Sequence, residues 1–400
     1  MKNKSRYFFQ AILCYMLIIT FIVGSDITIA SAKSKQYSAE ALEVVINGVL
    51  EFKQKQTKAG SVQELINKEL TENAGKGSAE WLVIAMSQYK DEYDYNSYIK
   101  SLNSYINKNK SIKATDLQRI ALAFSATGGK DEFVQATINK SIGELGVMSY
   151  IYGLILLDSR AYQSEILKRD EIVDLILSLE LKDGGWSLGG KASDVDITAM
   201  AIQALAPYYA QDEVKSAVDK ALDLLSKLQL KTGDFKSWGT RSSESGAQVI
   251  TALSALNIDC QKDKRFIKNN KTLIDGLMLY NKADGGFSHV FEGKSDNTAS
   301  VQAMYSLVAY WRFLQGQDIF YNFTEDENAG AEGKNVVNKD LTTDPLKEKG
   351  RNELSNMVKK EDEKGFHIGR MVILPALSIT GVLIMACIYF TLRVRAKRTQ

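Results

Sequence analysis

The sequence predicts an all-α protein, in which paired helices close into a ring and one membrane-spanning helix follows near the C-terminus. Three observations lead to this prediction. Glycine-rich turns recur about fifty residues apart, the stretches beside them have the period of an α-helix, and the alternation typical of β-strands is absent. With only 3 prolines in 400 residues, little interrupts the helices.

The first 32 residues have the features of an export signal. Lys2, Lys4 and Arg6 precede an uncharged stretch, and residues 30–32 read Ala-Ser-Ala, the small-x-small pattern that a signal peptidase accepts. We therefore expect a signal peptide over 1–32. An uncleaved N-terminal anchor stays open as an alternative, because the uncharged stretch is long for a cleaved signal.

A second uncharged run lies near the C-terminus. As a helix, residues 371–392 are long enough to cross roughly 30 Å of hydrocarbon, and the basic tail 393–400 places that end in the cytoplasm. Over 323–370 both charges mix with Asn, Gly and Thr, which is typical of a disordered stalk. We expect a single-pass protein of the cell membrane whose helical domain is extracellular.

The composition narrows the possible partners. A net charge of +2 provides no basic field, so no nucleic-acid partner is expected. Cys14, Cys260 and Cys387 fall in the signal, the domain and the span, so no disulfide within the chain is expected. The domain must therefore derive its stability from a hydrophobic core.

The clearest internal repeat is a glycine-rich turn. "LKDGGWS", "LKTGDFKSW" and "NKADGGFS" align Gly184, Gly233 and Gly285 at separations of 49 and 52 residues. An amphipathic helix with one solvent-exposed face precedes each turn, as over 212–229. A helix that is apolar on nearly every side follows each turn. This pattern indicates an outer helix paired with an inner one.

The same alternation, carried along the chain, gives six pairs. Six hairpins can close into a ring. An open solenoid would instead need polar capping repeats at its ends, and neither terminal pair has such a polar face. We therefore expect one domain over 37–322. The outer and inner helices are expected at 37–56 with 81–89, 93–107 with 115–127, 131–142 with 147–158, 162–180 with 193–205, 212–229 with 244–257, and 265–280 with 296–315.

The turns carry a resemblance to a known superfamily. "ELKDGGW" and "QLKTGDF" resemble the QW-type repeats of the terpenoid cyclases and protein prenyltransferases (the squalene cyclase/prenyltransferase repeat), with Glu180 in place of the usual Gln. This resemblance implies an α6/α6 toroid, an α/α barrel of six helical hairpins. Over 37–322 the chain is also similar to the toroid of exported bacterial surface proteins and of the corrinoid carriers transcobalamin and intrinsic factor.

What the resemblance implies about function is an analogy, because one fold can host many functions. It implies a non-catalytic, membrane-anchored surface toroid that binds a small hydrophobic or corrinoid-like ligand, or a protein partner. The corrinoid carriers clasp their ligand between the toroid and a small β-domain. No β-domain is predicted here, so a corrinoid ligand would require a partner chain.

Two carboxylates suggest an alternative function. Squalene-hopene cyclases carry Asp-x-Asp-Asp followed by Thr-Ala, and Asp194, Asp196, Thr198 and Ala199 match that motif. The resemblance implies a terpenoid-cyclase-like enzyme in which Asp196 is the general acid that protonates an alkene. Ile197 replaces the third aspartate and removes part of that arrangement.

Helix capping also explains these acids. Ser193 as N-cap with Asp196 three residues later forms a capping box, and both aspartates lie where the helix dipole favours anions. Similar polar clusters open the other inner helices. We favour this interpretation and expect no catalytic residue.

A metal site is not expected. Protein prenyltransferases hold zinc with an Asp-x-Cys pair and a distant His, whereas here Asp259 is adjacent to Cys260 and His289 lies elsewhere. Zinc needs at least three protein ligands. We expect neither a metal nor another cofactor.

Aromatic side chains are the candidate ligand contacts. Those in the turns are expected to pack structurally, and they are Trp186, Phe235, Trp238 and Phe287. Others lie near the C-terminal ends of inner helices, where we expect one mouth of the toroid and a ligand wall. These are Tyr208, Tyr209, Tyr305, Tyr310 and Trp311.

Overall fold

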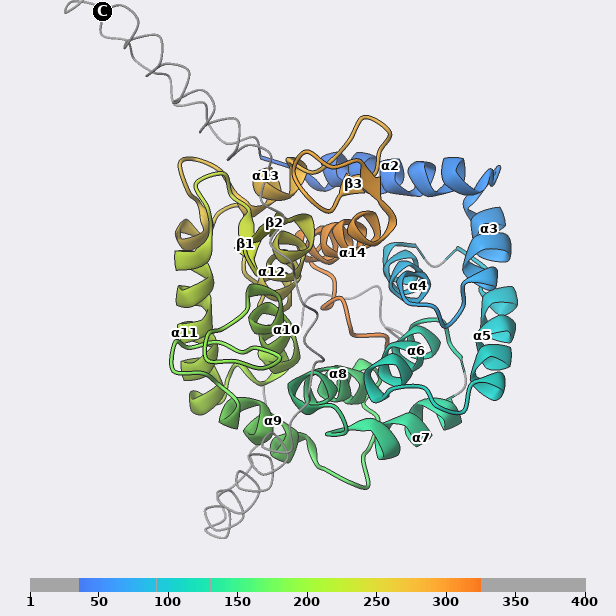
Figure 1. The fold of residues 1–400 in the computed structure, drawn as a ribbon, viewed down its shortest axis with the longest axis horizontal. Coiled ribbons are helices and arrows are strands. Elements are labelled where there is room, and N and C mark those ends of the chain that lie inside the picture. The colour runs from blue at the N-terminus through green and yellow to red at the C-terminus, as the bar shows by residue number, and fades with distance from the viewer. Residues whose placement is uncertain (1–35, 91, 130, 325–400) are drawn as a thin grey trace, which may run out of the picture. The chain divides into compact units, whose positions relative to one another are not determined.

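Six inner helices form a closed circle in the part of the chain that the computed structural model describes, residues 36–90, 92–129 and 131–324. Each inner helix packs against the next, and the last packs back against the first (Figure 1). The predicted inner helices are thus confirmed as a toroid-like ring. They are α4 (Ser78–Tyr89), α6 (Ala114–Ala126), α8 (Gly146–Ser159), α10 (Val195–Leu205), α12 (Ser243–Ala255) and α14 (Asn297–Leu314).

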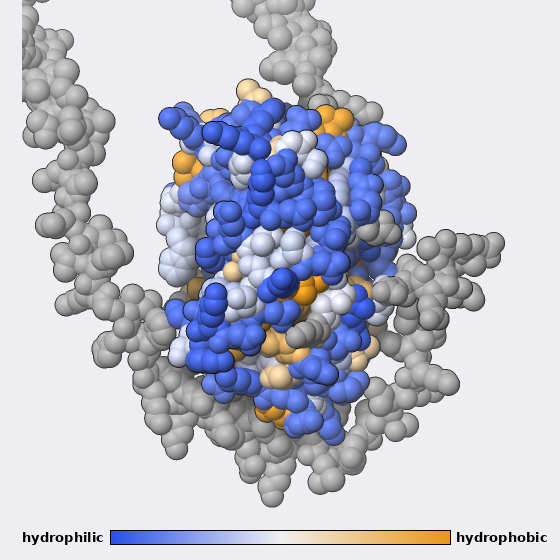
Figure 2. Space-filling view, turned by 90° about the vertical axis from the view of Figure 1, so that its right-hand side faces the viewer, coloured by the Kyte–Doolittle hydropathy of each residue, from blue (hydrophilic) through white to orange (hydrophobic). Residues whose placement is uncertain are grey.

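An outer layer of helices surrounds this circle. In α11, buried Val214, Val218 and Leu222 face inward, so the predicted amphipathic stripe is confirmed. The outer face on the side of α3 and α5 is mainly hydrophilic (Figure 2). The outer segments are α3 (Val62–Leu65) with the π-helical turn η1 (Ile66–Leu70), α5 (Asn96–Lys108), α7 (Asp131–Ser141), α9 (Arg169–Ser178), α11 (Asp212–Leu228) and α13 (Leu273–Met278), with short 3-10 turns at η2 (Ala206–Tyr208) and η3 (Lys264–Phe266).

The first helix, α2 (Ala39–Thr57), departs from the predicted pairing. It packs against α14 rather than against α4, and the segment α3–η1, which the sequence did not indicate, precedes α4. Buried Lys53 links α2 to both segments: its Nζ lies 2.5 Å from Glu69 Oε1 in η1 and also donates to Asn297 Oδ1 at the start of α14. Pairing 37–56 with 81–89 was therefore wrong, and α2 instead joins the beginning of the domain to its end.

Two short β-hairpins occupy the glycine-rich turns, where an all-α fold predicted none. They are β1 (Phe235–Ser237) with β2 (Thr240–Ser242), and β3 (Phe287–Ser288) with β4 (Ser295–Asp296). Gly233 has φ +91°, and a Cβ there would lie 2.3 Å from the carbonyl oxygen of Thr272. The recurring glycine therefore lets each turn touch the next outer helix.

The turn aromatics pack as expected, with one exception. Trp186, Phe235 and Phe287 are fully buried, and Trp186 Nε1 donates to the carbonyl of Ile176 at 2.7 Å. Trp238 is 77% exposed at the tip of its hairpin, so the expectation of packing is wrong for this residue.

After α14 the chain crosses the centre of the ring (Figure 1). Phe323 donates its backbone N–H to the carbonyl of Ser159 at 2.7 Å, at the C-terminal end of α8. The Phe320 ring lies 5.8 Å from that of Tyr305. Buried Phe323 thus belongs to the packed domain, although the sequence assigned it to the stalk.

The remaining predicted segments lie outside the described residues. These are the signal over 1–32, the stalk beyond residue 324, the span over 371–392 and the tail over 393–400. Within the described ranges no helix combines the length and apolar character needed to cross a membrane.

A central cavity at the N-terminal ends of the inner helices

A cavity of about 220 Å³ lies inside the ring. Several of its lining residues come from the first turns of inner helices, so it sits toward their N-terminal ends. Tyr321, from the segment that crosses the centre, also lines the cavity. The lining residues are Trp81, Met148, Tyr152, Asp196, Met200, Glu244, Gln248, Gln302, Tyr305 and Tyr321.

Asp194 caps helix α10 beside this cavity. Its Oδ1 accepts from the backbone N–H groups of Asp196 at 2.9 Å and Ile197 at 3.0 Å, and its Oδ2 accepts from Ser237 Oγ at 2.7 Å. Ser193 instead donates its N–H and its hydroxyl to the two carboxylate oxygens of Asp183. The predicted capping box between Ser193 and Asp196 is therefore wrong, and the capping role belongs to Asp194.

Asp196 is left free of capping, and its side chain lines the cavity. Its Oδ1 is buried and accepts no hydrogen bond from any described residue. Burial raises the pKa of Asp196 to about 6, and the charges of Asp194 and Glu244 act in the same direction. A hydrogen bond from Ser245 and the proximity of His289 oppose that rise. Near neutral pH the cavity therefore holds a carboxylate with incomplete solvation.

Glu244 supplies a second acid from the first turn of α12. Its Oε1 lies 2.8 Å from His289 Nδ1, and its Oε2 accepts from Ser243 Oγ at 3.1 Å. The backbone carbonyl of His289 accepts from the Ser243 N–H at 3.1 Å, which holds the segment that carries the histidine against α12. Among the described residues, no three His, Cys, Asp or Glu side chains are grouped to hold a metal ion.

Aromatic side chains make up another part of the cavity lining, which we call the aromatic wall. The Trp81 ring centroid lies 5.7 Å from that of Tyr152 and 6.2 Å from that of Tyr305, with tilted planes. Burial raises the pKa values of Tyr152, Tyr305 and Tyr321. All three hydroxyls are therefore neutral at physiological pH.

A chain of glutamine amides fixes the wall between α10 and α14. Gln203 Nε2 donates to the side-chain and backbone oxygens of Gln248, both at 3.0 Å. Gln248 Nε2 in turn donates to Gln302 Oε1 at 3.3 Å. The amides of Gln248 and Gln302 are thus held in place at the cavity surface.

Of the five predicted ligand contacts, only Tyr305 lines this cavity. The side chains of the other four bond to acids elsewhere: Tyr208 to Asp158 at 3.0 Å, Tyr209 to Asp219 at 2.6 Å, Tyr310 to Asp259 at 2.7 Å, and Trp311 to Glu43 at 3.0 Å. The structure does not bring these four together with Tyr305 at a cavity. The prediction placed the ligand wall at the C-terminal ends of the inner helices. The segment after α14 crosses the ring at that end.

A spacing signal in the sequence could have found several of the lining residues that sequence reasoning missed. Three pairs lie four residues apart on inner helices, the spacing that puts both side chains on one helix face. Each pair includes at least one polar or aromatic residue in an otherwise apolar helix. These pairs are Met148 with Tyr152, Asp196 with Met200, and Glu244 with Gln248.

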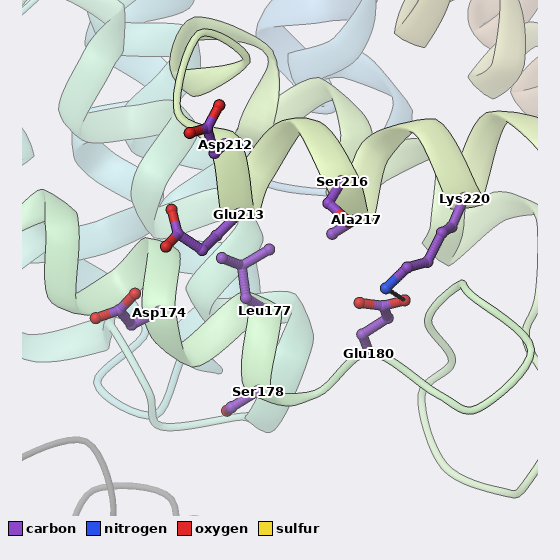
Figure 3. Close-up of a pocket in the computed structure, with 9 residues that line it drawn as sticks. All are labelled: Asp174, Leu177, Ser178, Glu180, Asp212, Glu213, Ser216, Ala217 and Lys220. Atoms are coloured by element: carbon purple, nitrogen blue, oxygen red, sulfur yellow. Dashed lines mark hydrogen bonds and ion pairs between the residues drawn. The ribbon is translucent and has the colours of Figure 1, made fainter. Parts of the chain in front are cut away.

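A larger hollow, of about 460 Å³, lies on the outer wall between α9 and α11 (Figure 3). It is lined mainly by charged and small polar side chains, and Lys220 Nζ lies 3.3 Å from Glu180 Oε1. Exposed charges of this kind are satisfied by water and by each other. We therefore place the candidate site in the central cavity, where a buried carboxylate oxygen has no partner.

Comparison with known proteins gives structural likeness alone. No protein-family profile and no curated protein matches the chain. An ent-copalyl diphosphate synthase from Streptomyces platensis is similar at 14% identity, with a TM-score of 0.40. The similarity covers 60% of this chain and 50% of the synthase chain, so this chain spans half the length of that protein. A possible member of the GH105 family from Salmonella enterica subsp. enterica serovar Paratyphi A is similar at 12% identity and a TM-score of 0.36, covering 67% of this chain and 82% of its own.

Proposed function

We propose that the chain is a non-catalytic surface module that binds a small molecule in its central cavity. The observation that carries this proposal is the carboxylate of Asp196: its side chain lines the cavity, and its buried Oδ1 has no hydrogen-bond partner among the described residues. A buried acceptor without a partner is unfavourable. A ligand that donates to this oxygen would remove that penalty. The predicted signal over 1–32 and span over 371–392 would hold the module at the outer face of the cell membrane.

The cavity volume favours a ligand of modest size. About 220 Å³ is below the roughly 300–1,000 Å³ of pockets that hold drug-sized ligands. A corrinoid is too large to enter it and would have to sit on the mouth, against a partner chain. A small ligand with an apolar part is the better match to the lining of aromatic and methionine side chains.

Mass spectrometry of small molecules that co-purify with the full-length chain tests this proposal. The parent should carry a compound that is depleted in the variant Met200→Trp, whose larger side chain would occupy part of the cavity. Leu177→Trp in the outer hollow is the matched control and should retain the compound. Equal recovery from both variants would place the compound outside the central cavity and refute the proposal.

A second candidate function is acid catalysis by Asp196 on a terpenoid, as the cyclase motif suggests. The raised pKa of Asp196, about 6, and the aromatic wall favour this alternative. However, a raised pKa makes the carboxylic acid a weaker proton donor toward an alkene. Asp194, which the motif pairs with it, is engaged in capping. Incubation with linear polyprenoids, with Asp196→Asn alongside, tests the alternative: cyclised product from the parent only would establish it.

A further inference from the structure

We infer that the ligand of the central cavity is a small organic cation, with its ammonium group on Asp196 and Glu244 and its apolar part against the aromatic wall. This inference rests on the proposed function and names the chemical class of its ligand. Both parts of such a ligand have a counterpart among the lining residues.

The acidic side of the cavity suits an ammonium group. Asp196 Oδ1 lacks a partner within the described chain, and a charged N–H donor makes a stronger hydrogen bond to a carboxylate than a neutral donor does. Glu244 lines the same cavity, and exposed His289 contacts one of its oxygens. A bound cation would therefore relieve the repulsion between two acids that line the same cavity.

The aromatic wall suits a cation as well. A cation within about 6 Å of an aromatic ring face is attracted by its electron density, most strongly by tryptophan. Trp81 is near two other rings, with its centroid 5.7 Å from that of Tyr152 and 6.2 Å from that of Tyr305. The thioethers of Met148 and Met200 add polarisable contacts for an apolar body.

Helix dipoles would favour an anion, because several inner helices begin near the cavity and the N-terminal end of a helix is partially positive. Their first turns, however, already carry acids of the chain itself. Asp194 caps α10, Asp296 caps α14 by accepting from the Ala299 N–H at 2.9 Å, and Glu244 lies in the first turn of α12. These carboxylates offset the positive helix ends, so the site keeps its preference for a cation.

Arg119 is a cation close enough to oppose, in part, the rise that burial causes in the pKa of Tyr152. Its guanidinium is already held by two acids: Nε lies 3.3 Å from Glu80 Oε2, and Nη1 lies 2.5 Å from Asp116 Oδ1. Glu80 is itself fully buried. Arg119 therefore adds no uncompensated positive charge to the cavity.

Three probes of similar size and different charge test the inference by isothermal titration of the full-length chain near neutral pH. They are 2-phenylethylammonium, neutral 2-phenylethanol and anionic 3-phenylpropanoate. The cation should bind about tenfold or more tightly than the alcohol, and the anion should bind most weakly. Asp196→Asn should weaken binding of the cation about tenfold while changing that of the alcohol by about twofold or less.

Glu180→Gln, in the outer hollow, is the matched control and should leave all three affinities unchanged. If Asp196→Asn fails to fold, Glu244→Gln replaces it, with the same expected loss for the cation alone. Alcohol binding as tight as that of the cation would overturn the inference and leave the cavity a site for small molecules. Failure of all three probes would also overturn it, whereas the proposed function is decided separately by the co-purifying compound and its loss in Met200→Trp.

Discussion

The Oδ1 atom of Asp194 accepts a hydrogen bond from the backbone N–H of Asp196, 2.9 Å away. One acid therefore begins the helix while its neighbour, two residues later, faces the cavity. The two residues that resemble a catalytic motif thus have different environments: Asp194 has partners for both carboxylate oxygens, and Asp196 has a buried oxygen without one.

Replacing these two acids should affect stability differently. Asp194→Ala removes a helix cap and should lower the free energy of unfolding by about 1–2 kcal/mol. Asp196→Asn removes a charge that burial disfavours and should leave stability near neutral pH equal to or above that of the parent. Urea melts of both variants measure the difference. A larger loss for Asp196→Asn than for Asp194→Ala would contradict the capping assignment.

Stability should also depend on pH through Asp196. Its pKa rises from 3.8 to about 6 on folding, so the folded state binds the proton more tightly. The parent should therefore gain stability from this group as the pH falls through about 6 toward 3.8, and lose it as the pH rises. Asp194, Glu244, His289 and Ser245 all influence this titration.

At each pH, the free energy of unfolding of Asp196→Asn is subtracted from that of the parent. This difference largely cancels the contributions of other titrating groups. The difference should change by a few kcal/mol over this window at most. A difference that does not vary with pH would show that Asp196 keeps an ordinary pKa in the folded protein.

The glycine of the repeated turn should be irreplaceable. Gly233→Ala adds a Cβ 2.3 Å from the Thr272 carbonyl oxygen at φ +91°, so we expect a loss of more than about 1 kcal/mol. Gly246 in α12 is the control, because an added Cβ there meets nothing within 4 Å. Gly246→Ala should be neutral or stabilise the helix by up to ~1 kcal/mol. Thermal melts that rank the two variants in the reverse order would exclude this account of the turn.

The buried ion pair that holds α2 should be costly to break. Lys53 is 2% exposed, and Lys53→Ala would leave the carboxylate of Glu69 without its cation, which we expect to cost about 3–5 kcal/mol. Lys55, in an exposed pair with Glu51, is the matched control on the same helix. Lys55→Ala should change stability by about 0.5 kcal/mol or less. Similar chemical melts for both variants would argue against α2 as a closing element.

Topology is open to a direct test. If the signal over 1–32 and the span over 371–392 act as predicted, protease added to intact cells should degrade the toroid and spare the tail over 393–400. Epitope tags at the C-terminus and in an exposed loop would report the two sides. A protected toroid would mean that the predicted orientation is wrong.

Sequence patterns predicted the ring well because helical periodicity records which face of each helix is buried, as in α11. They placed the cap one residue early, because Ser193 and Asp194 are both favourable N-cap residues and only the contact with Asp183 separates them. They also pointed to the C-terminal ends of the inner helices, whereas the central cavity lies toward the N-terminal ends. The position of the cavity depends on the segment with Tyr321 and Phe323. These residues contact parts of the chain that are distant in sequence, and such contacts produce no periodic pattern in the sequence.

The contact between α2 and α14 has a consequence for synthesis of the protein. Lys53 bonds to Asn297, 244 residues later, so the face of α2 that packs against α14 stays uncovered until nearly the whole domain has left the ribosome. In a solenoid, by contrast, each repeat is completed by its neighbour. Long-range closure of this kind slows folding and leaves early helices open to aggregation or chaperone binding. A nascent chain that stalls before α14 would therefore present α2 to the cell's quality-control machinery.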